Sequence, residues 1–228
     1  MSAVFAYWPA LIDGLITTIW VAITSILGSA VVSLILGTLR ISRKRSLRII
    51  ASLLIEVFRG ASALVFLFWV FYALPLLPGM PRLSPIMASI GVLALVGGAY
   101  GAEIVRGAIE SINSSQSDAC HALGLTPWQG LTRVILPQAL SQIVPSFGSL
   151  AADLVKWTSI ISFVGVQDIF YVANTVRSVT YQTVSVFTLL AAIYWTICLL
   201  SSLFFRFLEH FLPLNRALRL SAQQTAAG

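Results

Sequence analysis

Three pairs of an acidic and a basic residue are the clearest candidates for functional ion pairs in this otherwise hydrophobic chain. They are Glu56 with Arg59, Glu103 with Arg106, and Asp153 with Lys156. Partners three residues apart lie on one face of a helix, so each pair can neutralise itself. An unpaired charge at the centre of a bilayer costs at least roughly 2.5–3.5 kcal/mol, which favours pairing within a membrane helix. The first two pairs can anchor helix ends or form part of an inner gate, and the pattern leaves both roles open.

A polar stripe leads up to the third pair. Its members are Gln138, Gln142, Ser146, Ser149, Asp153 and Lys156, at steps of 4, 4, 3, 4 and 3 residues. This spacing follows one face of a helix. A polar face is costly against lipid, so it must contact protein or a water-filled cavity. The stripe therefore predicts either bonds between helices or the lining of a translocation path, in which Gln142, Ser146, Ser149, Asp153 and Lys156 would take part.

Residues that could support an enzyme are few and scattered. The candidates are His121, His210, Cys120 and Cys198, which have no metal-ligand spacing and no paired nucleophile and base. The two lysines, Lys44 and Lys156, follow no glycine-rich loop, so the chain lacks a P-loop for ATP. We expect no catalytic residue, no metal and no cofactor. An intramembrane enzyme and a non-transporting scaffold subunit are the two alternatives to a membrane protein that moves a solute.

Composition places these residues in a membrane protein. The 228 residues are 58% hydrophobic and 10% charged, with a mean hydropathy of +0.92. A soluble domain carries roughly 25% charged residues. The net charge of +6 could suggest nucleic acid, but five basic residues cluster between Arg40 and Arg48. Such a cluster indicates a cytoplasmic loop beside anionic headgroups, with no role in nucleic-acid binding.

Long uncharged runs divide the chain into about five membrane-spanning helices. A run of about 20 apolar residues is long enough to cross the hydrocarbon as a helix. Continuous apolar runs favour helices over the alternating strands of a barrel. We predict an all-α membrane domain over 12–210, with spans near 12–39, 52–77, 83–105, 138–165 and 182–206. Residues 1–11 are expected in the periplasm and 211–228 in a cytoplasmic tail.

The basic residues orient these spans. One side would carry ten of them, Arg40, Arg43, Lys44, Arg45, Arg48, Arg106, Arg133, Arg206, Arg216 and Arg219. The other side would carry Arg82 and Arg177. The positive-inside rule places the richer side in the cytoplasm. The N-terminus is therefore expected outside and the C-terminus inside, as an odd number of spans requires.

Small residues predict which spans pack closely. Ser25, Ser29, Ser33 and Gly37 recur every four residues in the first span, and Ala94, Gly98 and Ala102 do so in the third. Such seams let two helix backbones approach each other within the membrane.

The segment between the third and fourth spans has its own helix signals. Serines before Ser117 can cap a short helix that starts near that residue, and Gly124 can end it. Thr126 and Pro127 can open a second helix, because proline is tolerated in a first turn. The sequence thus predicts a short helix on the cytoplasmic face.

This segment resembles the EAA loop of the permease subunits of bacterial ABC importers. The matching residues are Asp118-Ala119-Cys120, Gly124 and Ile135-Leu136-Pro137, with Asp and Cys in place of the usual Glu and second Ala. Further stretches are similar to the polar amino acid subgroup, of histidine, glutamine and glutamate type: Glu56–Gly60, Ala99–Gly107, Leu136–Ala139 and Lys156–Ser159. The stretch Gly60–Val65 is closer to permeases of ectoine importers, which carry a small zwitterionic solute.

The resemblance implies a permease in the bacterial inner membrane that imports a small polar or zwitterionic solute by alternating access. Its partners would be two ATP-hydrolysing subunits, a second, similar permease and a periplasmic solute-binding protein. The coupling helix, seated in an ATPase groove, would comprise Asp118, Ala119, Cys120, Leu123, Gly124, Pro127 and Trp128.

Overall fold

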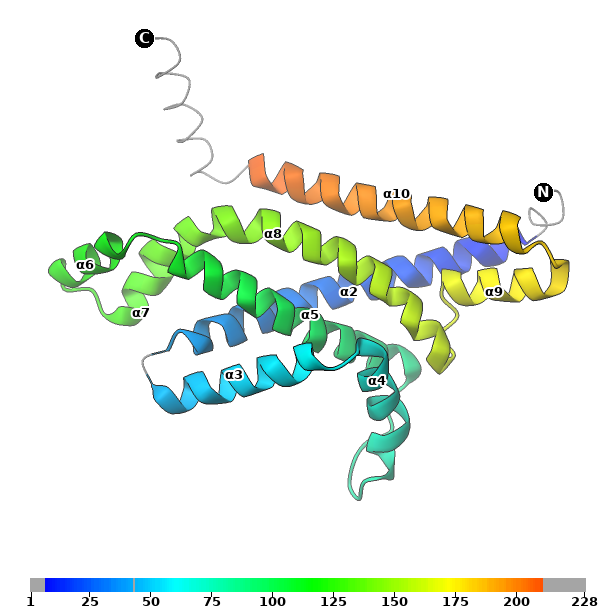
Figure 1. The fold of residues 1–228 in the computed structure, drawn as a ribbon, viewed down its shortest axis with the longest axis horizontal. Coiled ribbons are helices and arrows are strands. Elements are labelled where there is room, and N and C mark those ends of the chain that lie inside the picture. Colours follow the sequence, from blue (N-terminus) through cyan, green and yellow to red (C-terminus); the bar gives the residue numbers. More distant parts are fainter. Residues whose placement is uncertain (1–6, 43, 211–228) are drawn as a thin grey trace, which may run out of the picture.

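Helices make up the fold of the computed structural model, which describes residues 7–42 and 44–210 (Figure 1). The longest are α2 (Trp8–Arg40), α5 (Pro85–Glu110), α8 (Leu136–Trp157) and α10 (Thr183–His210). Shorter ones are α3 (Arg45–Gly60), α4 (Ala63–Phe68), α6 (Ser114–Ala122), α7 (Pro127–Gly130) and α9 (Ile169–Thr180). Two π-helical turns, η1 (Trp69–Ala73) and η3 (Leu131–Ile135), and two 3-10 turns, η2 (Leu74–Leu76) and η4 (Thr158–Val164), join them.

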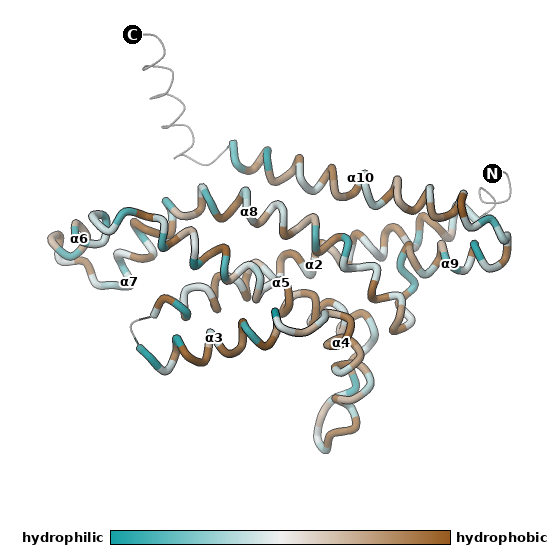
Figure 2. The backbone as a smooth tube through the Cα atoms, viewed as in Figure 1, coloured by the Kyte–Doolittle hydropathy of each residue, from teal (hydrophilic) through white to brown (hydrophobic). Residues whose placement is uncertain are grey.

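Four continuous helical stretches of the described chain are long and apolar enough to cross a membrane. They are Trp8–Arg40, Pro85–Glu110, Pro127–Val164 and Thr183–His210. The pair α3 and α4–η2 brings the number to five if it counts as one span. Figure 2 shows hydrophobic residues along these helices and hydrophilic residues gathered at helix ends. The prediction of an all-α fold with about five spans is confirmed.

The second span differs from the continuous helix expected near 52–77. α3 ends at Gly60, and the chain bends by 100° before the helical stretch of α4, η1 and η2 runs from Ala63 to Leu76. Ala61 and Ser62 have extended backbone angles, which interrupt the helical hydrogen-bond ladder. The hydropathy of the run is unaffected by this break, which explains why the sequence predicted one straight helix.

The other spans lie close to their predicted positions. α2 already begins at Trp8, so part of the expected terminal segment 1–11 is helical, while the expected tail 211–228 lies outside the described residues. The fourth span changes from α-helix to 3-10 helix at Thr158. An additional helix, α9, lies between the fourth and fifth spans, where the sequence predicted no element.

The small-residue rows predicted on the first and third spans both lie at close helix contacts, and they pack against each other. α2 and α5 pack along their lengths, and Ser25, Ser29, Ser33 and Gly37 of α2 are buried. They face a row of small residues on α5, including the buried Ala94, Gly98 and Ala102. Ser33 Oγ also lies 3.2 Å from the carbonyl oxygen of Gly98, to which it donates a hydrogen bond. The pair therefore forms a closely packed scaffold.

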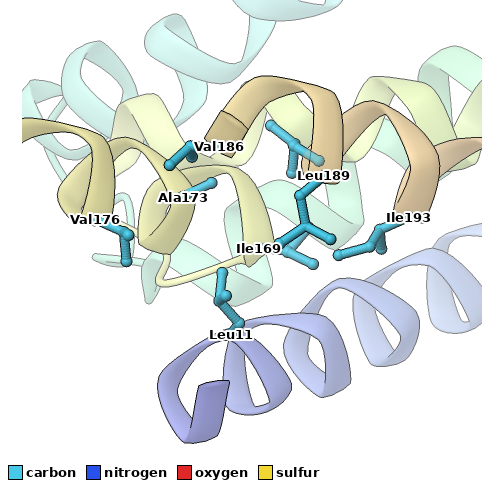
Figure 3. Close-up of a pocket in the computed structure, with 8 residues that line it drawn as sticks. Leu11, Ile169, Ala173, Val176, Val186, Leu189 and Ile193 are labelled. Atoms are coloured by element: carbon cyan, nitrogen blue, oxygen red, sulfur yellow. The ribbon is translucent and has the colours of Figure 1, made fainter. Parts of the chain in front are cut away.

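The bundle has two distinct ends, which we call the α6 end and the α9 end. The turn between α2 and α3 lies beside α6 and α7, since both line one cavity of about 530 Å³. At the α9 end, Leu11 of α2 packs against Ile169, Ala173 and Val186 from α9 and the start of α10 (Figure 3). The start of α2 therefore lies at the opposite end of the bundle from the α6–α7 segment (Figure 1).

Candidate translocation path and coupling segment

The segment between α5 and α8 forms the two short helices that the sequence predicts. α6 begins at Ser114, three residues before the expected start, because the Asn113 side chain caps it by accepting a hydrogen bond from the Ser115 N–H at 3.0 Å. Gly124 follows the helix with φ of +70°, the left-handed conformation expected there. Thr126 caps α7, and the Gln129 side chain completes a capping box.

This segment presents large apolar side chains on its surface. Leu123 and Trp128 are 78% and 67% exposed. Asp118 and Ala119 are also exposed, whereas Cys120 is buried against Gly130. Large apolar residues exposed on a short, capped element are typical of a protein-binding surface. The Asp118–Trp128 residues thus form one exposed face, with Cys120 as its internal support.

Two side-chain contacts join α8 to α6 and to the end of α5. Gln138 Nε2 donates to Gln116 Oε1 of α6 at 3.4 Å. Ser111 Oγ, at the end of α5, lies 2.7 Å from Gln142 Oε1. The first two positions of the polar stripe are therefore adjacent to the α6 end.

The remaining stripe residues face away from the chain's own core. Ser146, Ser149, Asp153 and Lys156 are exposed. The opposite face of α8 packs inward, with Ala139, Ile143, Phe147, Leu150 and Leu154 buried. Lys156 Nζ lies 2.9 Å from Asp153 Oδ1, which confirms this predicted ion pair, although the two side chains remain 59% and 51% exposed. Within the described chain, these four side chains form no hydrogen bond to another long helix. They must therefore contact water or another chain.

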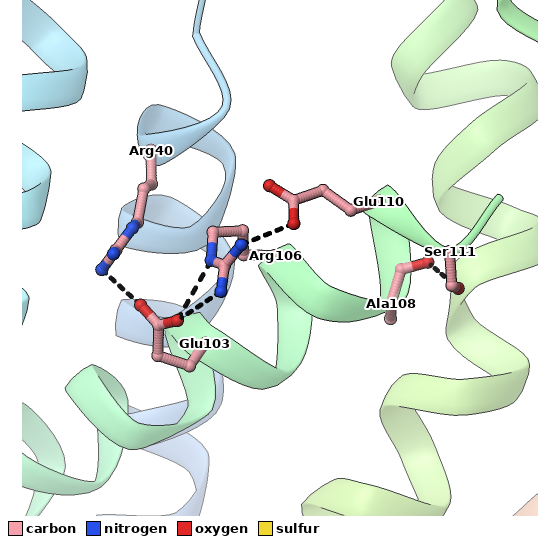
Figure 4. A network of polar contacts seen from close by, with 6 residues as sticks. All are labelled: Arg40, Glu103, Arg106, Ala108, Glu110 and Ser111. Atoms are coloured by element: carbon pink, nitrogen blue, oxygen red, sulfur yellow. Dashed lines mark hydrogen bonds and ion pairs between the residues drawn. The ribbon is translucent and has the colours of Figure 1, made fainter. Parts of the chain in front are cut away.

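A chain of ion pairs links α2 to α5 near the α6 end (Figure 4). Arg106 binds Glu103 at 3.0 Å, as the spacing predicts, and also binds Glu110. Arg40 of α2 binds the other carboxylate oxygen of Glu103. The sequence did not indicate Arg40 as a partner, because 63 residues separate it from Glu103. The network extends the α2–α5 packing into the charged end of the bundle.

The predicted ion pair of Glu56 with Arg59 is wrong. Glu56 and Arg59 are both exposed on α3, and the described structure has no ion pair between them. The Arg59 guanidinium instead lies over the Tyr100 ring of α5, 5.2 Å from its centroid, a cation–π contact. An i, i+3 spacing permits a pair but does not require it, and the aromatic ring offers Arg59 another partner.

Comparison with known proteins identifies the family of this helical membrane protein. Residues 29–212 match the family described as the inner membrane component of binding-protein-dependent transport systems. The chain belongs to this family. It is a permease subunit of an amino acid ABC importer, in which separate subunits hydrolyse ATP, and the enzyme alternative is not favoured.

Individual relatives cover most of the permease. A probable amino-acid ABC transporter permease, y4tF of Sinorhizobium fredii, is 40% identical over 84% of this chain and 82% of its own length. The glutamine transport system permease GlnP of Escherichia coli is 31% identical over 91% of this chain and 95% of its own.

Solved structures share the same fold. An amino acid ABC transporter crystallised with histidines has a TM-score of 0.81 at 30% identity, over 91% of this chain and 96% of that one. An inward-facing MetNI methionine ABC transporter, with a TM-score of 0.74 at 21% identity over 88% of this chain and 97% of that one, supports the fold alone.

The permease also has a buried polar site that sequence reasoning missed. Asp168 is fully buried before α9 and caps it, with Oδ1 accepting from the Tyr171 N–H at 2.9 Å. Burial raises the pKa of the Asp168 carboxyl to about 6, although backbone N–H groups oppose this shift. Nearby, Thr18 Oγ1 of α2 accepts from the Ile169 N–H at 3.0 Å. An aspartate before an apolar run is an N-cap signal, so the sequence offered a hint of the cap but none of its burial.

Proposed function

We propose that the permease moves its solute along the polar stripe of α8. The observation that carries this proposal is the exposure of Ser146, Ser149, Asp153 and Lys156 on a helix whose opposite face is the core. In a bilayer such a face is stable against water or a polar partner surface, and costly against lipid. A second, similar permease facing this stripe would enclose a polar path between the two chains.

The stripe suits a zwitterionic solute of amino acid or amino-acid-like structure. Asp153 and Lys156 offer one charge of each sign, 2.9 Å apart, and both remain half-exposed. An ammonium and a carboxylate on the solute can each find a partner of opposite charge there. The serine and glutamine side chains add neutral hydrogen-bonding groups. Polar amino acids and ectoine-like compatible solutes both fit this description.

The exposed face of α6 and α7 is proposed as the coupling element. Asp118, Ala119, Leu123, Gly124, Pro127 and Trp128 would contact the ATPase, with Cys120 holding α6 against Gly130. Two ATPases would act on the two permeases, and a periplasmic binding protein would deliver solute at the α9 end. The α6 end is then cytoplasmic. The ion network of Glu103 and Arg106 with Arg40 would hold α2 to α5 while the permease changes between its inward- and outward-facing states. Glu56 and Arg59 lie on the neighbouring helix α3.

Thiol accessibility tests the proposed path. Ser149→Cys is introduced into a Cys120→Ala, Cys198→Ser background of the assembled transporter in vesicles, and a charged, membrane-impermeant thiol reagent is added to both faces. We expect rapid labelling that changes when ATP and solute-loaded binding protein are added, because the position would face water in a state-dependent manner.

Ile16→Cys is the matched control, since Ile16 is 59% exposed on α2, a helix apolar enough to cross the membrane. Lipid should protect it from the charged reagent in every state. If Ser149→Cys is as unreactive as Ile16→Cys with and without ATP, the stripe does not line the path.

A further inference from the structure

We propose that a phospholipid acyl chain binds in an apolar groove formed by α2, α8 and α10 of the permease. The groove has a volume of about 780 Å³. This size lies within the range of roughly 300–1,000 Å³ that ligand sites in proteins occupy. Apart from Ser33 and Ser201, the side chains that line it are aliphatic or aromatic.

The groove is concave, which distinguishes it from an ordinary lipid-facing surface. Its floor consists of buried side chains, among them Ala22, Ile143 and Phe147. Its rims consist of exposed ones, including Leu27 of α2 and Phe204 of α10. A single flexible hydrocarbon chain can follow such a channel and contact floor and rims together.

Helix packing explains why the chain leaves this space open. α10 packs closely on α8, where the backbone of Gly148 approaches Phe205 so that an added Cβ would lie 2.7 Å from the Phe205 Cβ. α2 packs mainly on α5 and only over a short stretch on α8. α2 and α10 therefore stand on either side of α8, at most marginally in contact with each other in the described structure, and α8 forms the floor between them.

An empty groove would be unfavourable in the hydrocarbon region. Side chains that face a void lose their dispersion contacts on that side. Water cannot compensate, because the floor and rims offer almost no hydrogen-bonding groups. An apolar occupant is therefore required.

The position of the polar stripe selects lipid over a second permease as that occupant. The stripe residues Ser146, Ser149 and Asp153 lie on one face of α8, while the groove residues Val144, Phe147 and Val155 lie on roughly the opposite face. At 3.6 residues per turn the two sets are separated by about half a turn. This step rests on the proposed function: if the stripe faces the partner permease, the groove faces outward, toward the bilayer.

The groove is also long enough to hold a lipid acyl chain. Along α2 it runs from Ile19 to Leu34, which is about 22 Å at 1.5 Å per residue. One leaflet contributes about 15 Å of hydrocarbon, half of the total thickness of roughly 30 Å. On α10 the lining runs from Ile197 to Leu208, in the half nearer the α6 end. An acyl chain of the leaflet at that end can therefore lie along most of the groove.

A photoreactive lipid tests the proposal. The assembled transporter is reconstituted in vesicles of phosphatidylethanolamine and phosphatidylglycerol that include a phospholipid with a diazirine in its acyl chain. After illumination, adducts are mapped by mass spectrometry. We expect adducts enriched at least about threefold on the rim residues Leu27, Leu200 and Phe204 over equally exposed residues outside the groove.

Filling the groove should remove this enrichment. Ala30→Phe places an aromatic ring among the lining residues of α2, and Ser201→Phe does so independently from α10 if the first variant assembles poorly. Val31→Phe is the control, because Val31 is 58% exposed on α2 but does not line the groove. It should leave the adduct pattern unchanged.

Two results would overturn the proposal. One is an equal distribution of adducts inside and outside the groove in the unmodified permease. The other is cross-linking of the groove, by a diazirine amino acid placed at Leu200, to the second permease in place of lipid. Neither result depends on thiol labelling at Ser149, so the failure of this proposal can be told apart from the failure of the proposed path.

Discussion

Two glycines of the permease share a backbone conformation but lie in different places. Gly124 and Gly79 have φ of +70° and +81°, and a Cβ added at either would meet no atom within 4 Å. A side chain at either position therefore costs about 1 kcal/mol through the left-handed backbone alone. The isolated fold does not distinguish the two. A difference between them in the transporter must come from what docks against them.

Gly124→Asp should leave membrane insertion intact but weaken ATPase association and abolish uptake, because Gly124 lies on the proposed coupling face. Gly79→Asp should retain most transport at the same backbone cost. The measurements are co-purification of the ATPase and solute uptake at matched protein levels, with binding-protein affinity for solute as a check. Unchanged transport by Gly124→Asp would show that α6 and α7 are not the coupling element.

Asp168 predicts a pH effect on stability. Its pKa of about 6 in the folded state lies above the ordinary value of 3.8, since burial disfavours the charged form. The native state therefore binds this proton more tightly than the unfolded state does. The stabilising contribution is full below about pH 3.8 and is lost as pH rises through about 6.

Asp168→Asn keeps an oxygen that can cap α9 and removes the charge. Its melting temperature should rise relative to the unmodified permease as the pH increases from 4 to 7. Asp168→Ala, which lacks both the charge and the cap, should be about 1 kcal/mol less stable than Asp168→Asn across that range. A constant difference between the Asn variant and the unmodified permease at every pH would contradict the raised pKa.

At the scale of helices, the close approach of α2 and α5 depends on glycine at defined positions. A Cβ at Gly98 would overlap the Val32 side chain, whereas one at Gly91, on the same helix, would meet nothing within 4 Å. Overpacking of a close contact costs about 1–3 kcal/mol. Alanine in place of an unhindered helical glycine gains roughly 0.5–1 kcal/mol.

We therefore expect opposite signs for two matched substitutions in α5. Gly98→Ala should lower the thermal stability of the purified permease, and Gly91→Ala should leave it unchanged or raise it. Unfolding followed by loss of the monodisperse chromatographic peak measures both. Equal effects would show that the α2–α5 seam tolerates widening.

Variants of the Asp153/Lys156 pair can distinguish a role in stability from a role in transport. Asp153→Asn alone leaves Lys156 without its partner, which should impair assembly because an uncompensated charge is costly in a membrane. The double variant Asp153→Asn, Lys156→Met should restore insertion and assembly while uptake stays at least about tenfold reduced. Normal uptake by the double variant would assign the pair no direct role in transport.

Sequence patterns predicted those helix features that depend on local chemistry. The caps around Gly124 and Thr126 and the small-residue seam are encoded by residues close in sequence, and the structure has them. The bend after Gly60 was not predictable, because hydropathy is the same for a straight and a broken span. α9 has only 12 residues, too few to span a membrane, and the Arg40–Glu103 contact joins residues far apart in the chain. Both depend on tertiary packing.

At the scale of the whole molecule, the two ends of the bundle differ in charge. The α2–α3 turn, with Lys44 and Arg45, lies beside α6 and α7 at one end. The start of α2 lies against α9 and the start of α10 at the other end. Among the described residues, Arg40 at the end of α2 also lies at the α6 end, whereas Arg177 lies in the last turn of α9 at the other end. A loop rich in Lys and Arg is retained in the cytoplasm during insertion, so the α6 end should be inside.

Reporter fusions test this orientation. A reporter that is active in the periplasm alone should be active when fused after Met80, which precedes α5 at the end of the bent second span, and silent when fused after Arg45. The fusion after Arg45 retains most of the basic cluster that is expected to hold the α2–α3 turn inside, so its silence should not depend on later helices. A second reporter, active in the cytoplasm alone, should give the converse result at both sites and exclude poor expression as the cause of silence. Periplasmic activity after Arg45 with silence after Met80 would reverse the topology, and would place α6 and α7 on the face of the membrane where no ATPase can reach them.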